Sequence, residues 1–217
     1  MIVNQPLFGV PPMPIESPAT RCAWCSSDPL YQHYHDTEWG VPEYDPQALF
    51  EKLLLDGFQA GLSWLTILKK REHYRRVYRG FDPVFMAAQT DADLQVLLTD
   101  PGIVRNRLKV AAARQNARAW LQLAGREDPA AWLWQFVGGQ PKINCFASLA
   151  EVPAQTAEAQ AMSRALKQAG FSFVGPTICY AFMQATGMVM DHTLDCFQHA
   201  PLADAMAEDR AQCRHSE

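Results

Sequence analysis

Residues 166–177 read LKQAGFSFVGPT and join two stretches that have helical periodicity. Gly170 and Gly175 flank a short apolar turn in this segment. Glycine adopts backbone angles that other residues resist, and it lets a main chain approach a ligand closely. Pro176 suits the first turn of the second helix, where unpaired N–H groups attract anions. The segment therefore predicts either a helix-hairpin-helix element that grips a phosphate or an ordinary pair of packed helices.

The chain on either side of this hairpin also favours helices. Asp45-Pro46 and Asp82-Pro83 each place a capping carboxylate before a proline at the first helical position. No segment alternates between apolar and polar residues as a half-buried strand does. We therefore expect an all-α fold. Caps, breakers and apolar spacing predict helices over 47–56, 63–79, 83–88, 90–100, 104–124, 130–137, 156–169, 177–186 and 192–199.

Composition indicates one globular domain with a tail at each end. Of the 217 residues, 48% are hydrophobic, which is too many for a disordered chain and enough for a core. Residues 1–20 contain five prolines and predict a disordered arm. We expect a single domain over 21–200 and a polar, frayed tail over 201–217. The start of the chain lacks the basic region of a signal peptide, and no apolar run is long enough to cross a membrane. We therefore expect a cytoplasmic protein with reduced thiols.

Positive charge is concentrated in the middle of the chain. Residues 69–118 carry eleven lysines and arginines against five acidic residues, a balance of +6. The whole chain has a net charge of −4, so the remainder carries −10. A basic segment inside an acidic chain is typical of a local phosphate-binding surface, although it also fits a solvated helix face.

Cysteine and histidine residues gather near both ends of the predicted domain. His192 and Cys196 are four residues apart, so on the predicted helix both would lie on one face. Cys22, Cys25 and His35 lie near the other end. A structural zinc ion takes four Cys or His ligands, and two from each end would tie the ends together. Cys22 with Cys25 and Cys22 with His35 are rival pairs that spacing does not separate. Taken singly, such residues are more often buried filler or hydrogen-bonded core residues.

Large aromatic side chains are concentrated near a carboxylate early in the chain. Trp24, Tyr34, Trp39 and Trp64 are flat groups that stack on nucleobases or on a cationic ring. Asp56 lies between them in the sequence and is placed to accept hydrogen bonds from an exocyclic amine. The alternative is that these rings form the core and that Asp56 caps the end of its helix.

Several strings in the chain now suggest a family. They are RCAW (21–24), DPLYQHYHDTEWGVP (28–42), FQAGLSWLTILKKRE (58–72), GIVRNRLK (102–109) and GFSFVGPTICYAFMQATGMVMDH (170–192), followed by Cys196. Over about 21–196 the chain resembles the bacterial DNA-3-methyladenine glycosylase I family, a branch of the helix-hairpin-helix glycosylases. The resemblance implies an all-α fold whose ends are joined by a structural zinc ion. It assigns that ion to Cys22, His35, His192 and Cys196, and it leaves Cys25 as a bystander.

The resemblance also implies roles for the aromatic residues and the hairpin. It implies a base-binding pocket with Asp56 as the catalytic carboxylate, formed with Tyr34, Trp64, Trp24, Trp39 and Gln59. DNA-binding residues would be Gly61 and Leu62, which fill the gap left in the duplex, together with Gly170, Phe173 and Gly175 of the hairpin. The family usually has a glutamate at the position of Asp56, so this chain has a carboxylate with one methylene less of reach.

The implied activity is base-excision repair. The partner would be double-stranded DNA with alkylated bases, and the reaction would be hydrolysis of the N-glycosidic bond of 3-methyladenine. A base methylated at N3 is cationic and is already a good leaving group. Pro176 and Thr177 follow Gly175, so no lysine is available there for strand cleavage through a Schiff base. We expect a monomer in which Asp191 is structural. The rival hypotheses are a lesion-binding module without catalysis and a zinc hydrolase that acts on a small molecule.

Overall fold

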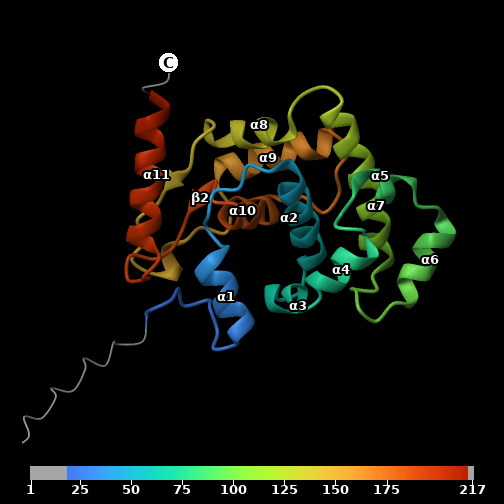
Figure 1. Ribbon diagram of the computed structural model, residues 1–217, viewed down its shortest axis with the longest axis horizontal. Coiled ribbons are helices and arrows are strands. Elements are labelled where there is room, and N and C mark those ends of the chain that lie inside the picture. Colours follow the sequence, from blue (N-terminus) through green and yellow to red (C-terminus); the bar gives the residue numbers. More distant parts are fainter. Residues whose placement is uncertain (1–18, 215–217) are drawn as a thin grey trace, which may run out of the picture.

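The computed structural model describes residues 19–214 and is predominantly helical, which confirms the expected helical class (Figure 1). The predicted arm lies outside the described residues except for its last two positions. No helix in the described range is long and apolar enough to cross a membrane. The helices are α1 (Pro29–Thr37), α2 (Pro46–Gln59), α3 (Trp64–Leu68), α4 (Arg71–Val77), α5 (Pro83–Ala88), α6 (Asp91–Thr99), α7 (Arg107–Ala124), α8 (Pro129–Trp134), α9 (Ala157–Gln168), α10 (Pro176–Ala185) and α11 (His199–Arg214), with the 3-10 helices η1 (Gln135–Val137) and η2 (Leu149–Glu151).

Asp-Pro pairs begin four of these helices. Asp28, Asp45, Asp82 and Asp128 each accept a main-chain N–H bond from the first turn, and a proline follows each of them. The proline has no N–H to leave unpaired, and its fixed φ suits the first helical position. The two helix starts predicted from Asp45 and Asp82 are therefore confirmed, with the physical cause that was expected.

The predicted helix over 63–79 is wrong in one respect, because the structure divides it into α3 and α4. At the junction the N–H of Lys70 bonds to the carbonyl of Ile67, three residues back, and this tighter turn ends α3. The predicted helix over 192–199 is also wrong. In that helix the N–H of Phe197 would bond to the carbonyl of Thr193, but it bonds instead to the carbonyl of Thr20, in the segment before α1.

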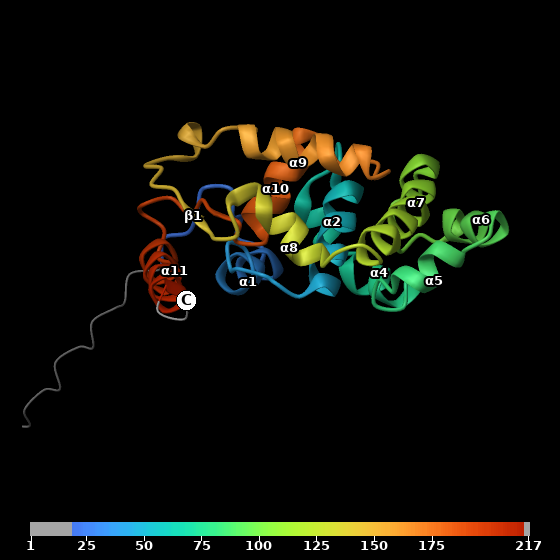
Figure 2. The same cartoon turned by 90° about the horizontal axis from the view of Figure 1, so that it is seen from above.

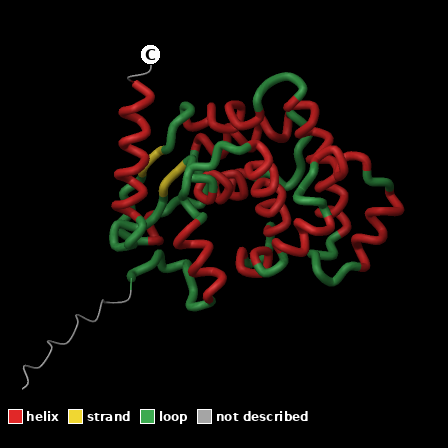
Figure 3. Tube along the Cα trace, in the orientation of Figure 1, coloured by secondary structure: helices red, strands yellow, loops and turns green. Residues whose placement is uncertain are grey.

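The C-terminal part of the chain carries more regular structure than the sequence indicated. Two short strands, β1 (Lys142–Ile143) and β2 (Val189–Met190), pair in parallel, although no strand was expected. Both lie near α11 (Figure 3). The expected frayed tail is helical as far as Arg214.

The core lies around α10, which packs against α9 and α2. Phe182 of α10 and the neighbouring Phe50 and Leu53 of α2 are buried, as the apolar spacing of α2 predicted. Helices α4–α7 form one end of the molecule and α11 the other, with α2 and α10 between them (Figure 2). This arrangement sets α1, α2, α3 and α10 around one pocket.

Candidate functional site

A pocket of about 320 Å³ lies among α1, α2, α3 and α10. This volume is within the range of small-molecule sites. The six residues predicted to bind or act on a base all line it: Trp24, Tyr34, Trp39, Asp56, Gln59 and Trp64. Sequence reasoning missed several other lining side chains, among them Tyr31, Lys52, Tyr180 and Gln184.

The aromatic rings of the pocket lie in two contacting pairs. The Tyr34 and Trp64 ring centroids are 5.3 Å apart, and those of Trp24 and Trp39 are 4.9 Å apart. Tyr34, Trp39 and Trp64 belong to the buried core, and Trp24 packs against it. All four rings also line the pocket, so the two interpretations of these rings, as core and as pocket wall, both hold. The indole N–H groups of Trp24 and Trp64 are buried and have no hydrogen-bond partner among the described residues. Two unpaired donors therefore lie in the wall beside the pocket.

Asp56 is the buried carboxylate of this wall, with an exposed fraction of 1%. It does not end its helix, as the sequence had suggested, because α2 continues to Gln59. Its Oδ1 lies 2.5 Å from Nζ of Lys52, one turn earlier on the same helix. Its Oδ2 has no partner in the described part of the chain. Burial raises the pKa of Asp56, and the positive charge of Lys52 opposes this shift.

Asp191 lines the opposite part of the pocket and is fully engaged by neighbours. It accepts hydrogen bonds from Asn144 Nδ2 at 2.7 Å, from the Tyr180 hydroxyl at 2.6 Å and from Gln184 Nε2 at 2.8 Å. Burial, followed by the hydrogen bond to this carboxylate, raises the pKa of Tyr180. These three hydrogen bonds hold the carboxylate of Asp191 in place.

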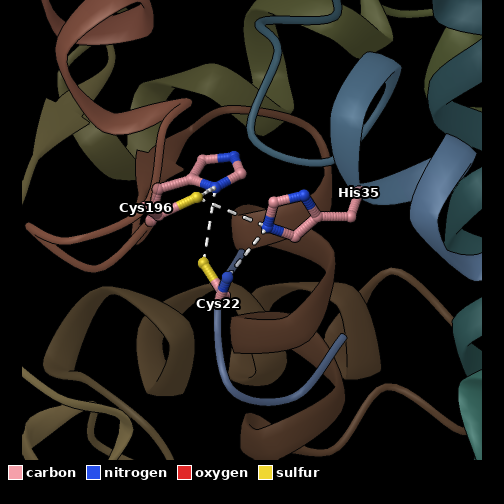
Figure 4. Close-up of side chains that lie close together, drawn as sticks. Cys22, His35 and Cys196 are labelled. Carbon is pink, nitrogen blue, oxygen red and sulfur yellow. Dashed lines mark hydrogen bonds between the residues drawn. The ribbon is translucent and has the colours of Figure 1, made fainter. Parts of the chain in front are cut away.

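The four predicted metal ligands meet in one buried cluster, and their ligand atoms all lie within 4.8 Å of one another. Cys196 Sγ is 3.5 Å from His35 Nε2 and 3.3 Å from His192 Nδ1. Figure 4 shows Cys22, His35 and Cys196 turned toward one another. Cys25 is outside the cluster, and its thiol faces the carbonyl of Ser26. The geometry therefore favours the Cys22–His35 pair over the Cys22–Cys25 pair.

Hydrogen bonds on the outer side of this cluster orient both imidazoles. His35 Nδ1 lies 2.8 Å from Asp36 Oδ1, and His192 Nε2 lies 3.0 Å from the carbonyl of Trp39. The other ring nitrogen of each histidine is thereby directed inward as an electron-pair donor, as in protein zinc sites. The hydrogen bond between the two sulfurs lowers the pKa of Cys196 and raises the pKa of Cys22, so Cys196 is the first of the two to lose its proton.

Gly40 packs against His192 of this cluster, and sequence reasoning missed it. Its φ is +84°, and a Cβ atom there would lie 3.0 Å from His192 Nε2. A side chain at this position would therefore be strained and would press on a cluster histidine. The GVP string after Trp39 was the available signal, since a glycine before a proline-containing turn often has a positive φ.

The predicted DNA-binding residues lie in two turns outside the pocket. Gly61 and Leu62 follow α2, and Leu62 has an exposed fraction of 41%. Lys109 of α7 fixes this turn, because its Nζ donates to the carbonyl oxygens of Phe58 at 2.8 Å and Ala60 at 2.6 Å. Sequence reasoning counted Lys109 only as a basic residue.

The second turn is the α9–α10 hairpin. Gly170 has a φ of +95° and needs glycine, whereas Gly175 has a φ of −65° and does not. Phe173 is left-handed, with a φ of +58°. The N–H groups of Phe173 and Gly175 make no hydrogen bond to any described residue. The turn therefore offers unpaired main-chain donors at the start of α10.

Comparison with known proteins gives independent evidence about the family to which this chain belongs. A family model described as Methyladenine glycosylase matches residues 24–199. DNA-3-methyladenine glycosylase 1 of Escherichia coli (strain K12) is 51% identical over 177 residues, which cover 81% of this chain and 95% of that protein. A crystal structure of 3-methyladenine DNA glycosylase I superposes with a TM-score of 0.82 at 52% identity, covering 83% of this chain and 100% of that one. A variant of such an enzyme in complex with 3-methyladenine has a TM-score of 0.79 at 37% identity, covering 82% and 97%.

Proposed function

Because this chain belongs to the methyladenine glycosylase family, we propose that it excises 3-methyladenine from alkylated double-stranded DNA. The observation that carries the proposal is the convergence of Tyr34, Asp56 and Trp64, from three different helices, on one pocket. A solved relative that holds 3-methyladenine supports the same class of ligand.

The reaction is hydrolysis of the N-glycosidic bond after the nucleotide has been turned out of the duplex. A damaged pair opens at a cost of a few kcal/mol or less. The flat cationic base is attracted to the aromatic faces of Tyr34 and Trp64. The unpaired Oδ2 of Asp56 accepts a hydrogen bond from the exocyclic amine of the base. The electron pair of the broken bond neutralises the base, so the leaving group needs no proton from the enzyme.

We assign the grip on DNA to the two turns outside the pocket. The α9–α10 hairpin acts as a helix-hairpin-helix element, and its free N–H groups bind a phosphate without reading sequence. Leu62, exposed beside Gly61, enters the gap left by the displaced nucleotide. The basic stretch from 69 to 118 supplies long-range attraction to the phosphates.

We propose that the Cys22, His35, His192 and Cys196 cluster holds one structural zinc ion. Two thiolates and two inward-facing imidazole nitrogens are the donor set that such an ion prefers. Four protein ligands leave no open position for water, which argues against a zinc hydrolase acting on a small molecule. The ion would join Cys22 and His35, before and on α1, to the segment before α11.

The experiment is an excision assay on duplex DNA methylated at adenine N3, run with the wild type and with Asp56→Asn. We expect the wild type to release 3-methyladenine and to leave abasic sites. Release that does not exceed a control without enzyme rejects the proposal, and binding without release favours the lesion-binding module. Borohydride should trap no covalent adduct on abasic DNA, since we propose no lyase step. Size-exclusion chromatography tests the expected monomer.

A further inference from the structure

Lys52 is a buried cation inside the pocket. Its side chain has an exposed fraction of 16%. Its Nζ lies 2.5 Å from Asp56 Oδ1 and 3.7 Å from the centroid of the Trp64 ring. The same atom is 6.0 Å from the centroid of Tyr34. The ammonium group therefore makes both of the contacts, with a carboxylate and with an aromatic face, that would attract a cationic base.

We propose that Lys52 is a specificity-determining residue that weakens the preference of this pocket for cationic over neutral bases. The inference rests on the proposed function, because it concerns the same pocket and the same ligand class. Lys52 offsets the charge of Asp56, so an entering base meets an ion pair instead of an isolated carboxylate. The ammonium group of Lys52 repels a positively charged base, whereas it does not repel a neutral base of the same shape.

The other charged groups around this pair do not replace it. Arg71 and Glu38 are the next charges that act on Lys52, and they pair with each other at 2.5 Å. Asp191, on the far wall, accepts hydrogen bonds from Asn144, Tyr180 and Gln184. All of these groups are unchanged in the variants below, which alter only the Lys52–Asp56 pair.

Recognition of the amine edge is separable from this effect on charge. Lys52 engages only Oδ1 of Asp56 and leaves Oδ2 without a partner among the described residues. An exocyclic amine is a donor in both the neutral and the cationic forms of a purine. Both forms therefore keep the hydrogen bond to Oδ2, and only the cationic form is opposed by Lys52.

The experiment compares two duplexes that differ in the charge of one base. The first contains 3-methyladenine, which is cationic, and its KM is measured in steady-state excision. The second contains 3-deaza-3-methyladenine, a neutral base of the same shape that retains the amine, and its Kd is measured by titration. Lys52→Met should lower the KM for the cationic base roughly tenfold and leave the Kd for the neutral base within about twofold. Lys52→Arg keeps the cation, so its preference between the two duplexes should stay near that of the wild type even where both affinities change.

A double variant controls for disturbance of the helix. Lys52→Met combined with Asp56→Asn removes both charges, so its preference for the cationic base should return toward that of the wild type. The expected order of preference is Asp56→Asn lowest, wild type and double variant intermediate, and Lys52→Met highest. Equal changes on both duplexes, or no change in Lys52→Met, would overturn the inference. Failure of the wild type to release 3-methyladenine would instead count against the proposed function.

Discussion

The side chain of Asn116 on α7 is hydrogen-bonded twice to the main chain of Ser172 in the α9–α10 hairpin. Its Oδ1 accepts from the Ser172 N–H at 2.8 Å, and its Nδ2 donates to the Ser172 carbonyl at 3.0 Å. Asn116 is buried, so both of its polar groups depend on these bonds. The pair fixes the hairpin immediately before Phe173, whose φ of +58° is unusual for a residue with a side chain.

We therefore expect Asn116→Ala to lower the free energy of unfolding by about 1–3 kcal/mol, because two main-chain groups of the partly buried Ser172 lose their partners. It should also weaken DNA binding, since the N–H groups of the hairpin would no longer be held in place. Urea unfolding and a DNA titration measure the two effects. Gln115→Ala is the matched control: its side chain makes one exposed bond to Gly170, so a smaller loss is expected. Equal effects in the two variants would contradict this account.

The metal cluster predicts different effects for substitutions of Cys22, which belongs to it, and Cys25, which does not. Cys22→Ala or His192→Ala should remove bound zinc and lower the Tm, because each deletes a ligand and breaks the link between distant segments. Cys25→Ala should do neither, since its thiol lies outside the cluster. Elemental analysis of purified protein and thermal unfolding give the two readouts. Zinc loss in the Cys25 variant would show that the ligand set is wrong.

The capping box of α6 predicts a pH dependence. Hydrogen bonds from Thr90 lower the pKa of Asp93 in the folded protein. A carboxyl whose folded pKa is lowered stabilises the fold above its ordinary pKa, which is about 3.9, and loses this contribution as the pH falls through the folded value. Urea unfolding is measured from pH 6 to pH 3 for the wild type and for Asp93→Ala. The gap between their free energies of unfolding should stay constant at the higher pH values and narrow only as the pH falls below about 3.9. A gap that widens toward acid would contradict the assignment.

Local signals in the sequence predicted much of the fold. The helix starts at Asp45 and Asp82 depend on adjacent residues only, so they could be predicted without tertiary information. The helix expected over 192–199 is absent because of a partner far away in the sequence, since the N–H of Phe197 bonds to the carbonyl of Thr20. His192 and Cys196 nevertheless meet, since the turn that replaces the helix also brings them together.

The sequence predicted the aromatic residues of the candidate pocket more completely than its charged residues. The predicted aromatic residues all line it, because large rings near a carboxylate are informative even without a fold. Lys52 was missed, since a lysine four residues before an aspartate usually indicates an exposed ion pair on a helix. Only the packing of α2 against its neighbours shows that this pair is buried and faces Trp64.

A substitution of Leu62 should affect excision from duplex DNA without affecting the stability of the fold. Its side chain is 41% exposed and lies in the turn after α2, so Leu62→Ala should change the free energy of unfolding by no more than about 0.5 kcal/mol. Excision from duplex DNA should fall strongly, because the gap left by the displaced nucleotide would no longer be filled. Val96→Ala is the matched control, an apolar side chain with an exposed fraction of 69% on α6, and it should change neither property. Excision from a single strand, which has no gap to fill, should be nearly equal in the wild type and Leu62→Ala. A loss of the same size on both substrates would mean that Leu62 supports the pocket and does not enter the duplex.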